Sequence, residues 1–215
     1  MVKGVIFDFD GVLVDSERKK FNDLRFILGE QGLRLGEDVF SVFIGKKTRS
    51  FLEHEFPTLV GSRLDAVLKR REIMQFQDLK KNKLIVGVRD LLRFLEMKKA
   101  VIMISTGSKR KFVEELLKVH KIRHYFSRII SGEDFSTSKP DPECFLVALR
   151  QMGLKPDYVI VIEDSAAGVA AAKAANIRVF AIKTYSKEAE LSGANKIFNN
   201  ALDLLDYIKK NYSNL

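Results

Sequence analysis

From residue 88 onward, short apolar runs alternate with segments of helical pattern, and this alternation constrains the fold more than any other feature of the chain. The runs at 100–104 and 158–162 are continuously apolar, as in strands that are buried on both faces. Strands that alternate with helices indicate a parallel sheet covered by helices. We therefore predict an α/β fold with a Rossmann-like core. The predicted strands are 2–8, 100–104, 128–130, 158–162, 177–182 and 196–198, and the predicted helices of this part are 88–98, 109–119, 141–152, 165–175 and one that ends near 209.

The stretch between the first strand and residue 82 has a different character. It carries helical periodicity and no convincing strand, with helices predicted at 16–31, 37–44, 48–55 and 60–80. Ser16 is the predicted N-cap of the first of these helices. Because the first strand belongs with the later sheet, we expect the core domain to comprise 1–15 and 82–215, and 16–81 to be an inserted helical domain.

Composition excludes several classes of protein. The net charge of +9 comes from 37 basic and 28 acidic residues that are spread along the chain, and no nucleic-acid motif accompanies the densest basic runs, 69–71 and 80–83. No apolar run approaches the ~20 residues that span a bilayer. Cys144 is the only cysteine, so no intrachain disulfide forms. We expect a cytoplasmic monomer with no nucleic-acid or membrane partner.

Acidic residues follow two of the predicted buried strands. Asp8 and Asp10 come at the end of the first strand and lead into Gly11, while Glu163 and Asp164 end the strand 158–162. Ligands of open α/β sheets bind at the carboxyl edge of the strands. Acids at the first turn of a helix also favour its dipole, but adjacent buried carboxylates are costly without a cation or a lysine nearby. Their oxygens suit Mg²⁺.

Anion-binding groups follow two other strands. Ser105, Thr106, Gly107 and Ser108 end the strand 100–104, and their hydroxyl and backbone donors suit an anion; the alternative is a plain helix cap by Ser108. Lys139 stands between Ser138 and Pro140 before a helix, where it could neutralise an anion or simply be an exposed lysine. Together with the acids, this set suits phosphoryl transfer to a carboxylate nucleophile.

With these residues, the chain resembles the haloacid dehalogenase (HAD) superfamily, in the branch that contains β-phosphoglucomutase and phosphoglycolate phosphatase. The resemblance covers essentially the whole chain. The motifs occur in family order and spacing: Asp8-Phe9-Asp10-Gly11-Val12, Ser105 after its strand, Lys139-Pro140-Asp141-Pro142, and Glu163-Asp164-Ser165 with Gly168.

The resemblance implies a role for each matching residue. Asp8 would attack phosphorus and form an aspartyl phosphate, and Asp10 would act as the general acid and then the general base. Ser105 and the backbone of Thr106 would hold phosphate oxygens. Lys139 would balance the charge around Asp8 and the phosphate.

The resemblance also implies a Mg²⁺ site, a helical cap and a restricted chemistry. The metal would be held by the Asp8 carboxylate, the Asp10 carbonyl and Asp164, with Glu163 as helper. Residues 16–80 resemble the cap that closes over the site and selects the substrate. The dehalogenases and phosphonate hydrolases of the superfamily have no aspartate at the position that corresponds to Asp10, so those activities are not expected here.

The cap sequence carries the weakest match. Residues 45–49 resemble the cap loop that faces the site, so Lys46, Lys47 and Arg49 are candidate substrate-binding residues; a basic surface loop is the equal alternative. Lys19 and Lys20 stand where many relatives carry an apolar residue and a histidine. Relative to Gly45, the arginine of the cap loop is displaced by one residue from its position in β-phosphoglucomutase. These departures disfavour mutase activity.

Three functions remain open from the sequence. The first is a Mg²⁺-dependent phosphatase of a small phosphorylated metabolite, such as a sugar phosphate or a compound like phosphoglycolate. The second is a sugar phosphomutase like β-phosphoglucomutase. The third is a non-catalytic binding or regulatory protein on the same fold, against which the intact motif set argues.

Overall fold

The structure is a computed structural model that describes residues 2–44 and 48–212. The chain divides into two compact units: Met1–Asp15 with Lys83–Leu215, and Ser16–Asn82. The first unit contains a parallel six-stranded sheet flanked by helices, and the second is the helical region between β1 and β4. The predicted α/β fold class is therefore confirmed.

The sheet has the strand order β5-β4-β1-β6-β7-β8, and all of its neighbouring strands run parallel. Phe7 at the end of β1 is in register with Ile104 on β4 and with Ile162 on β6. The residues that follow these three strands therefore meet at one edge of the sheet. The strands are β1 (Gly4–Phe7), β4 (Val101–Ser105), β5 (Arg128–Ile130), β6 (Val159–Glu163), β7 (Arg178–Ile182) and β8 (Lys196–Phe198).

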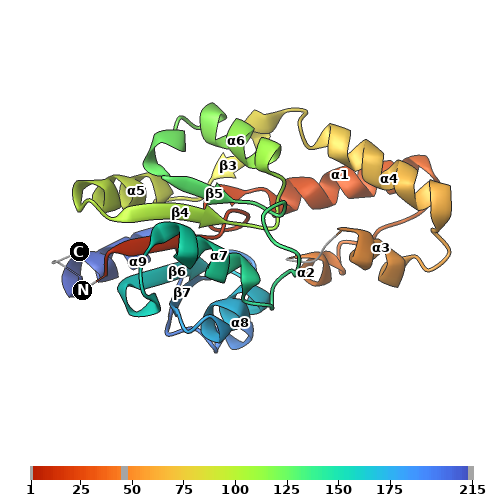
Figure 1. Cartoon of the computed structure of the whole chain (residues 1–215). Coiled ribbons are helices and arrows are strands. Elements are labelled where there is room, and N and C mark those ends of the chain that lie inside the picture. The colour runs from red at the N-terminus through yellow and green to blue at the C-terminus, as the bar shows by residue number, and fades with distance from the viewer. Residues whose placement is uncertain (1, 45–47, 213–215) are drawn as a thin grey trace. The chain divides into compact units, whose positions relative to one another are not determined.

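Alternate residues of the strands pack against helices on opposite faces, as the period of a strand requires. Ile6 and Val161 belong to the cluster under α7 (Glu143–Met152) and α8 (Ala166–Ala174). Phe180 points to the other face, where its ring meets Tyr207 of α9 (Ala201–Asn211) edge to face. Figure 1 shows α7 and α8 together, and α5 (Val88–Met97) and α6 (Arg110–Val119) on the other side of β4.

The helical unit has a small aromatic core of its own. Phe43 lies between Phe21 and Phe51, with ring centroids at 5.4 and 5.1 Å. Buried aliphatic side chains, such as Leu24 and Val67, complete this core. The helices are α1 (Glu17–Glu30), α2 (Phe40–Phe43), α3 (Thr48–Glu55), α4 (Gly61–Met74) and the 3-10 turn η1 (Leu79–Lys81).

The structure corrects the sequence analysis near the two linkers. A two-residue strand β2 (Val14–Asp15) pairs antiparallel with β3 (Lys83–Leu84), and neither was predicted, because two residues show no periodicity. The helix predicted over 60–80 ends at Met74. Ser16 precedes α1, but its side chain forms no capping hydrogen bond.

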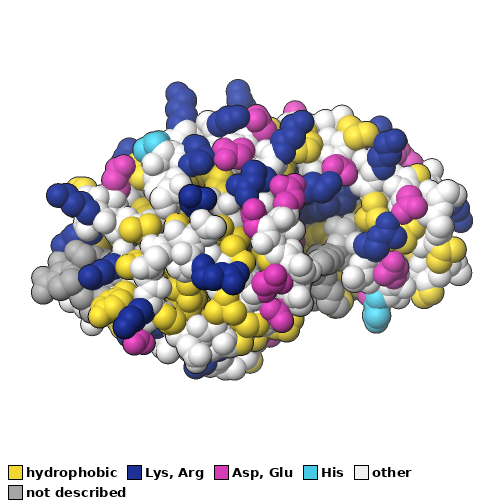
Figure 2. All heavy atoms as spheres, viewed as in Figure 1, with side chains coloured by type: hydrophobic (Ala, Val, Ile, Leu, Met, Phe, Trp, Pro, Cys, Tyr) yellow, Lys and Arg dark blue, Asp and Glu magenta, His cyan; other side chains and the backbone are white. Residues whose placement is uncertain are grey.

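The surface matches the expectation of dispersed charge. Figure 2 shows lysine and arginine side chains interspersed with acidic ones on the visible face. Over the described residues, no helix is both long and apolar enough to cross a bilayer.

Candidate active site at the carboxyl edge of the sheet

Asp8 is the centre of the site because it follows β1, the middle of the three strands that end together. Its backbone N–H donates to the Ile162 carbonyl at 2.9 Å, which extends the sheet by one residue. The Asp8 side chain is 11% exposed, and its carboxylate accepts from Lys139, whose Nζ lies 2.5 Å from Asp8 Oδ1. The same Nζ lies 2.5 Å from Glu163 Oε1. A single ammonium thus joins the acids that end two neighbouring strands.

Glu163 is held through both oxygens of its carboxylate. It is fully buried, and its second oxygen, Oε2, accepts from the Asp164 N–H at 2.8 Å and from the Ser165 N–H and hydroxyl at 3.0 Å. Both oxygens are therefore engaged within the protein. A Cβ on Gly168 would overlap this carboxylate, so glycine is required there. Glu163 therefore holds Lys139 and the turn into α8, and its expected part as a helper in a metal site stays a prediction.

The site carries more negative than positive charge. Burial raises the pKa of Asp8 to about 7, Glu163 and Asp10 act in the same direction, and Lys139 opposes them. Burial alone would lower the pKa of Lys139, but Asp8 and Glu163 outweigh it and hold that pKa above its usual value. Lys139 is therefore a permanent cation, and a further cation near Asp8 would favour its charged form.

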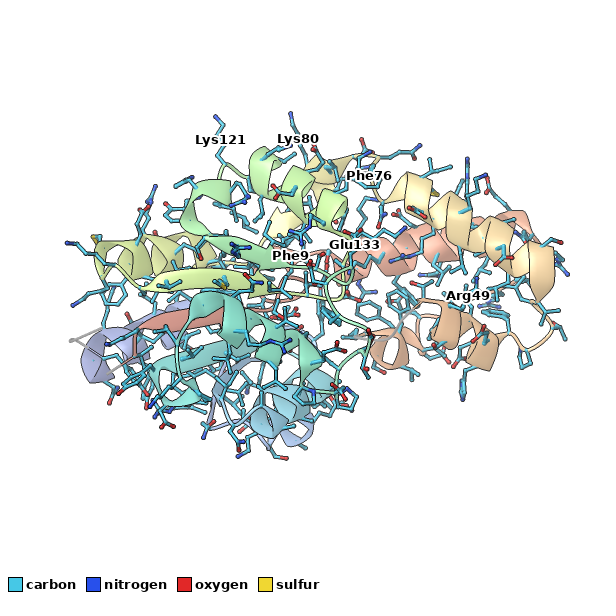
Figure 3. The ribbon with its side chains drawn as sticks, viewed as in Figure 1. Phe9, Arg49, Phe76, Lys80, Lys121 and Glu133 are labelled. Atoms are coloured by element: carbon cyan, nitrogen blue, oxygen red, sulfur yellow. The ribbon has the colours of Figure 1, made fainter. Side chains whose placement is uncertain are left out.

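The turn after β1 separates the two aspartates of the first motif. Phe9, labelled in Figure 3, is fully buried and meets Phe112 of α6 edge to face at 6.4 Å, so it points away from α7. Gly11 follows with a φ of +79°, a conformation that side chains disfavour. Its N–H donates to the Val14 carbonyl at 2.8 Å. Asp10 is thereby turned out of the strand.

The Asp164 carboxylate lies directly against this turn. A Cβ on Gly11 would overlap its oxygens, so Gly11 and the Asp164 carboxylate are in contact. The Thr184 hydroxyl donates to the Gly11 carbonyl at 2.5 Å and holds the turn from the end of β7. Asp164 therefore reaches the backbone next to Asp10, as a ligand set of carboxylates plus one carbonyl requires.

The donors that could hold a metal are the Asp8 and Asp164 carboxylates and the Asp10 carbonyl. Within the described residues, no group of three or more His, Cys, Asp or Glu side chains lies close enough to hold a metal alone. Mg²⁺, however, is usually held by one or two carboxylates with water and substrate phosphate completing its shell. Asp8, Asp164 and the Asp10 carbonyl supply oxygen only, beside an excess of negative charge. The set fits Mg²⁺ and does not suit a metal that prefers nitrogen or sulfur.

The hydroxyl of Ser105 is not directed toward an anion. Ser105 is the last residue of β4, is fully buried, and donates to the Cys144 carbonyl of α7 at 3.1 Å. The Thr106 N–H donates to the Ile130 carbonyl at 2.9 Å. Both predicted phosphate donors, the Ser105 hydroxyl and the Thr106 backbone, are therefore corrected, because the sheet and α7 already use them.

The next residues of this loop are better placed. Thr106 Oγ1 accepts from the Ser108 N–H at 3.1 Å and keeps its own proton to donate. A Cβ on Gly107 would meet nothing within 4 Å, so the loop is open there. The open side of this loop therefore begins one residue later than the sequence analysis placed it.

Ser108 does not cap the following helix. The N-cap of α6 is Lys109, and its start has no side-chain capping bond. The Ser108 hydroxyl instead donates to Asp10 Oδ2 at 2.5 Å. This bond joins the loops that follow β4 and β1.

The loop that carries Lys139 is fixed by its own helix. Glu143 Oε2 accepts from the Ser136 and Thr137 N–H groups at 3.0 and 2.7 Å, and Glu143 N–H donates to Asp141 Oδ1 at 2.9 Å. These bonds lower the pKa of Glu143. Lys139 therefore lies in a braced loop, and the alternative of an exposed lysine at a helix start is wrong.

The predicted cap residues have a mixed outcome. Lys46 and Lys47 lie outside the described residues. Arg49 is labelled in Figure 3 and pairs within the helical unit with Asp65 at 2.7 Å and with Glu53 at 3.8 Å. Half of its side chain is exposed, so Arg49 forms surface ion pairs, as in the alternative interpretation of the basic loop.

Two contributors were missed by the sequence analysis. Thr184 holds the Gly11 carbonyl, and the Tyr185 hydroxyl donates to Asp15 at the start of the first linker. Both follow β7, which pairs with β6 and ends at the same edge of the sheet. Their position after the predicted strand 177–182 was the signal that could have identified them.

Comparison with known proteins identifies the family of this chain. Residues 5–182 match the model of the family described as haloacid dehalogenase-like hydrolase. The chain is 31% identical over 186 residues to a phosphorylated carbohydrates phosphatase of Thermotoga maritima, covering 84% of this chain and 85% of that protein. It is 28% identical over 180 residues to a fructose-1-phosphate phosphatase of Escherichia coli, covering 81% and 93%.

A solved structure extends the likeness over nearly the whole chain. The crystal structure of a putative β-phosphoglucomutase from Thermotoga maritima superposes with a TM-score of 0.78 at 28% identity, covering 98% of this chain and 100% of that one. The residues 5–182 that match the family model include Asp8, Lys139 and Asp164. This chain belongs to the haloacid dehalogenase-like hydrolase family.

Proposed function

We propose that this hydrolase is a Mg²⁺-dependent phosphatase that acts on a small phosphorylated metabolite through an aspartyl-phosphate intermediate at Asp8. One observation carries the proposal: Asp8 is nearly buried, is bound by Lys139, and lies beside Asp10 on a separate turn. This arrangement gives one carboxylate to attack and a second to handle protons. Two of the relatives cited above are named as a phosphorylated carbohydrates phosphatase and a fructose-1-phosphate phosphatase.

The reaction consists of two displacements at phosphorus. Asp8 attacks, the bond to the ester oxygen breaks, and Asp10 gives its proton to that oxygen so that an alcohol leaves. Water then gives a proton to Asp10 and attacks the phosphorus, and the Asp8 carboxylate is released with inorganic phosphate. Lys139 remains charged in both steps and neutralises the transferring group.

The phosphate is held on the open side of the loop after β4. The Thr106 hydroxyl and the Gly107 N–H are the donors that we assign to phosphate oxygens, in place of Ser105. Thr106 has a proton to donate, and Gly107 leaves room for close approach. Hydrogen bonds to a charged group of this kind are about twice as strong as neutral ones.

The metal is assigned to Asp8, Asp164 and the Asp10 carbonyl. The family generally depends on Mg²⁺, and the oxygen donors fit it. When bound, Mg²⁺ would neutralise the phosphate and the charge excess of four carboxylates against one lysine. Glu163 supports the site by holding Lys139 and the turn at Asp164.

The helical unit Ser16–Asn82 is assigned as the cap domain that selects the substrate. A sugar phosphate or a compound like phosphoglycolate remains the proposed substrate class. Phosphomutase activity is the second candidate because of the likeness to a putative β-phosphoglucomutase. The two differ in whether water or a sugar hydroxyl attacks the intermediate.

The test is a phosphate-release screen over sugar phosphates, phosphoglycolate and p-nitrophenyl phosphate, with Mg²⁺ and with EDTA. β-Glucose 1-phosphate is assayed for glucose 6-phosphate as well as for phosphate. We expect metal-dependent phosphate release that Asp8→Asn abolishes. Turnover that survives Asp8→Asn would refute the nucleophile, and turnover in EDTA would refute the metal assignment.

A further inference from the structure

One hydrogen bond in the site has no part in the steps above. The Ser108 hydroxyl donates to Asp10 Oδ2 at 2.5 Å, although the two residues are 98 positions apart in the sequence. A serine before a helix ordinarily caps it, but the N-cap of α6 is Lys109 and Ser108 makes no such bond. The hydroxyl is therefore directed to the carboxylate rather than to the helix.

Ser108 is itself held firmly. Its N–H donates to Thr106 Oγ1, and its carbonyl accepts from the Gly132 N–H, both at 3.1 Å. A Cβ on Gly132 would overlap the Gly107 carbonyl, so the loops after β4 and β5 are packed against each other at this point. The position of the hydroxyl is thus set by backbone contacts from two strand ends.

A hydroxyl suits a carboxyl group that changes its protonation state. It has one donor and two acceptor sites, so it can donate to ionised Asp10 and accept from protonated Asp10. Asp10 must donate a proton in one step and accept a proton in the next. A fixed partner at Oδ2 would restrict rotation of the carboxyl group and direct Oδ1 toward the reacting oxygen, because a small misalignment costs a large factor in rate.

We propose that Ser108 is a positioning residue for Asp10, which keeps the general acid and base aligned during both displacements. The inference rests on the proposed function and deepens it. It also replaces the expectation that Ser108 binds the substrate directly. A substrate-binding serine would affect all esters alike, whereas a residue that acts through the general acid matters most when the leaving group needs a proton.

The experiment measures kcat/KM for a series of substituted phenyl phosphates with different leaving-group pKa values. These esters have nearly the same shape, and kcat/KM reports the steps through the first displacement. General acid catalysis contributes roughly 10²–10⁴-fold. We expect Ser108→Ala to lose about 10–100-fold on the poorest leaving group and under about 3-fold on p-nitrophenyl phosphate, which steepens the dependence on leaving-group pKa.

Three further variants separate positioning from structure. Ser108→Thr keeps a hydroxyl and should restore the wild-type slope, that is, the wild-type dependence of log(kcat/KM) on leaving-group pKa. Ser127→Ala, which removes a hydroxyl that donates to the Ile102 carbonyl far from this edge, should leave the slope unchanged. In an Asp10→Asn background, Ser108→Ala should have no further effect on the slope, because it acts through Asp10.

Each outcome decides the question. A wild type that releases no phosphate from any ester refutes the proposed function and this inference with it. An active wild type whose slope is unchanged in Ser108→Ala refutes the inference alone, whether the losses are equal for all esters or absent. A changed slope in Ser108→Ala that Ser108→Thr does not restore also refutes it.

Discussion

Replacing Glu163 with glutamine should destabilise the core unit much more than an ordinary charge removal. Glu163 accepts from Lys139 through Oε1 and from three donors of Asp164 and Ser165 through Oε2. A glutamine has only one acceptor oxygen, and its NH₂ group is a donor. Whichever way the amide is turned, its NH₂ group faces a donor in a fully buried position.

The magnitude follows from this buried conflict. Removing one partner of a buried ion pair costs about 3–5 kcal/mol. For a chain of this size, 1 kcal/mol shifts the melting temperature by about 2–4 °C, so Glu163→Gln should melt about 6–20 °C below the wild type. Thermal melts followed by circular dichroism in EDTA measure this shift without a contribution from metal binding.

The matched control is Glu188→Gln. Glu188 also pairs with a lysine, Lys183, at 2.9 Å, but 69% of its side chain is exposed. Its substitution should change stability by no more than about 0.5 kcal/mol, because exposed pairs contribute little. If Glu163→Gln and Glu188→Gln had the same melting temperature, the Glu163 carboxylate would not hold Lys139 and the turn at Asp164 as described above.

Three other predictions concern the loops and the acid stability of the core. Thr106→Val should lower kcat/KM for p-nitrophenyl phosphate by about 10–100-fold, which corresponds to the loss of a charged hydrogen bond of about 1.5–3 kcal/mol. Ser105→Ala should lower the melting temperature and have a smaller effect on kcat/KM. The reverse pattern would indicate that Ser105, and not Thr106, binds the phosphate. Gly11→Ala should raise the Mg²⁺ concentration needed for half-maximal activity, because its Cβ would overlap the neighbouring carboxylate, whereas Gly29→Ala, with nothing within 4 Å, should not; equal metal requirements would contradict the contact. Burial raises the pKa of Asp134, but hydrogen bonds outweigh this effect and hold the pKa below its usual value. The stability that Asp134 contributes is therefore present above the unfolded-state pKa of about 3.9 and is lost as the pH falls through the folded-state pKa. The difference in unfolding free energy between wild type and Asp134→Asn should therefore narrow below about pH 4, and a constant difference would contradict that sign.

The periodic part of the fold was predictable from the sequence. The apolar runs at 101–105 and 159–163 form β4 and β6 within a residue of the prediction, because strands buried on both faces leave a continuous apolar signal. The ribbon of β2 and β3 was not predictable, because its pairs depend on residues 70 positions apart, such as Val14 and Leu84. Local pattern carries no information about such a pairing.

The candidate site, like the fold, was predictable from the sequence only in part. Sequence order placed acids, hydroxyls and a lysine after strands, and parallel topology then brought those strand ends together. It did not distinguish Ser105 from Thr106, although one faces α7 and the other follows the strand. The face of a strand end depends on register with its neighbours, and a shift of one residue reverses it.

The sequence by itself determined the α/β class, the family and which residues are candidates for the reacting groups, because strand hydrophobicity and motif spacing are local properties. Only the tertiary structure decided what each group contacts. It joined Lys139 to both Asp8 and Glu163, turned Ser108 from a helix cap into a partner of Asp10, and set Asp164 against Gly11. These contacts connect segments that are far apart in the chain, and only the packing of the strand ends brings them within hydrogen-bonding distance.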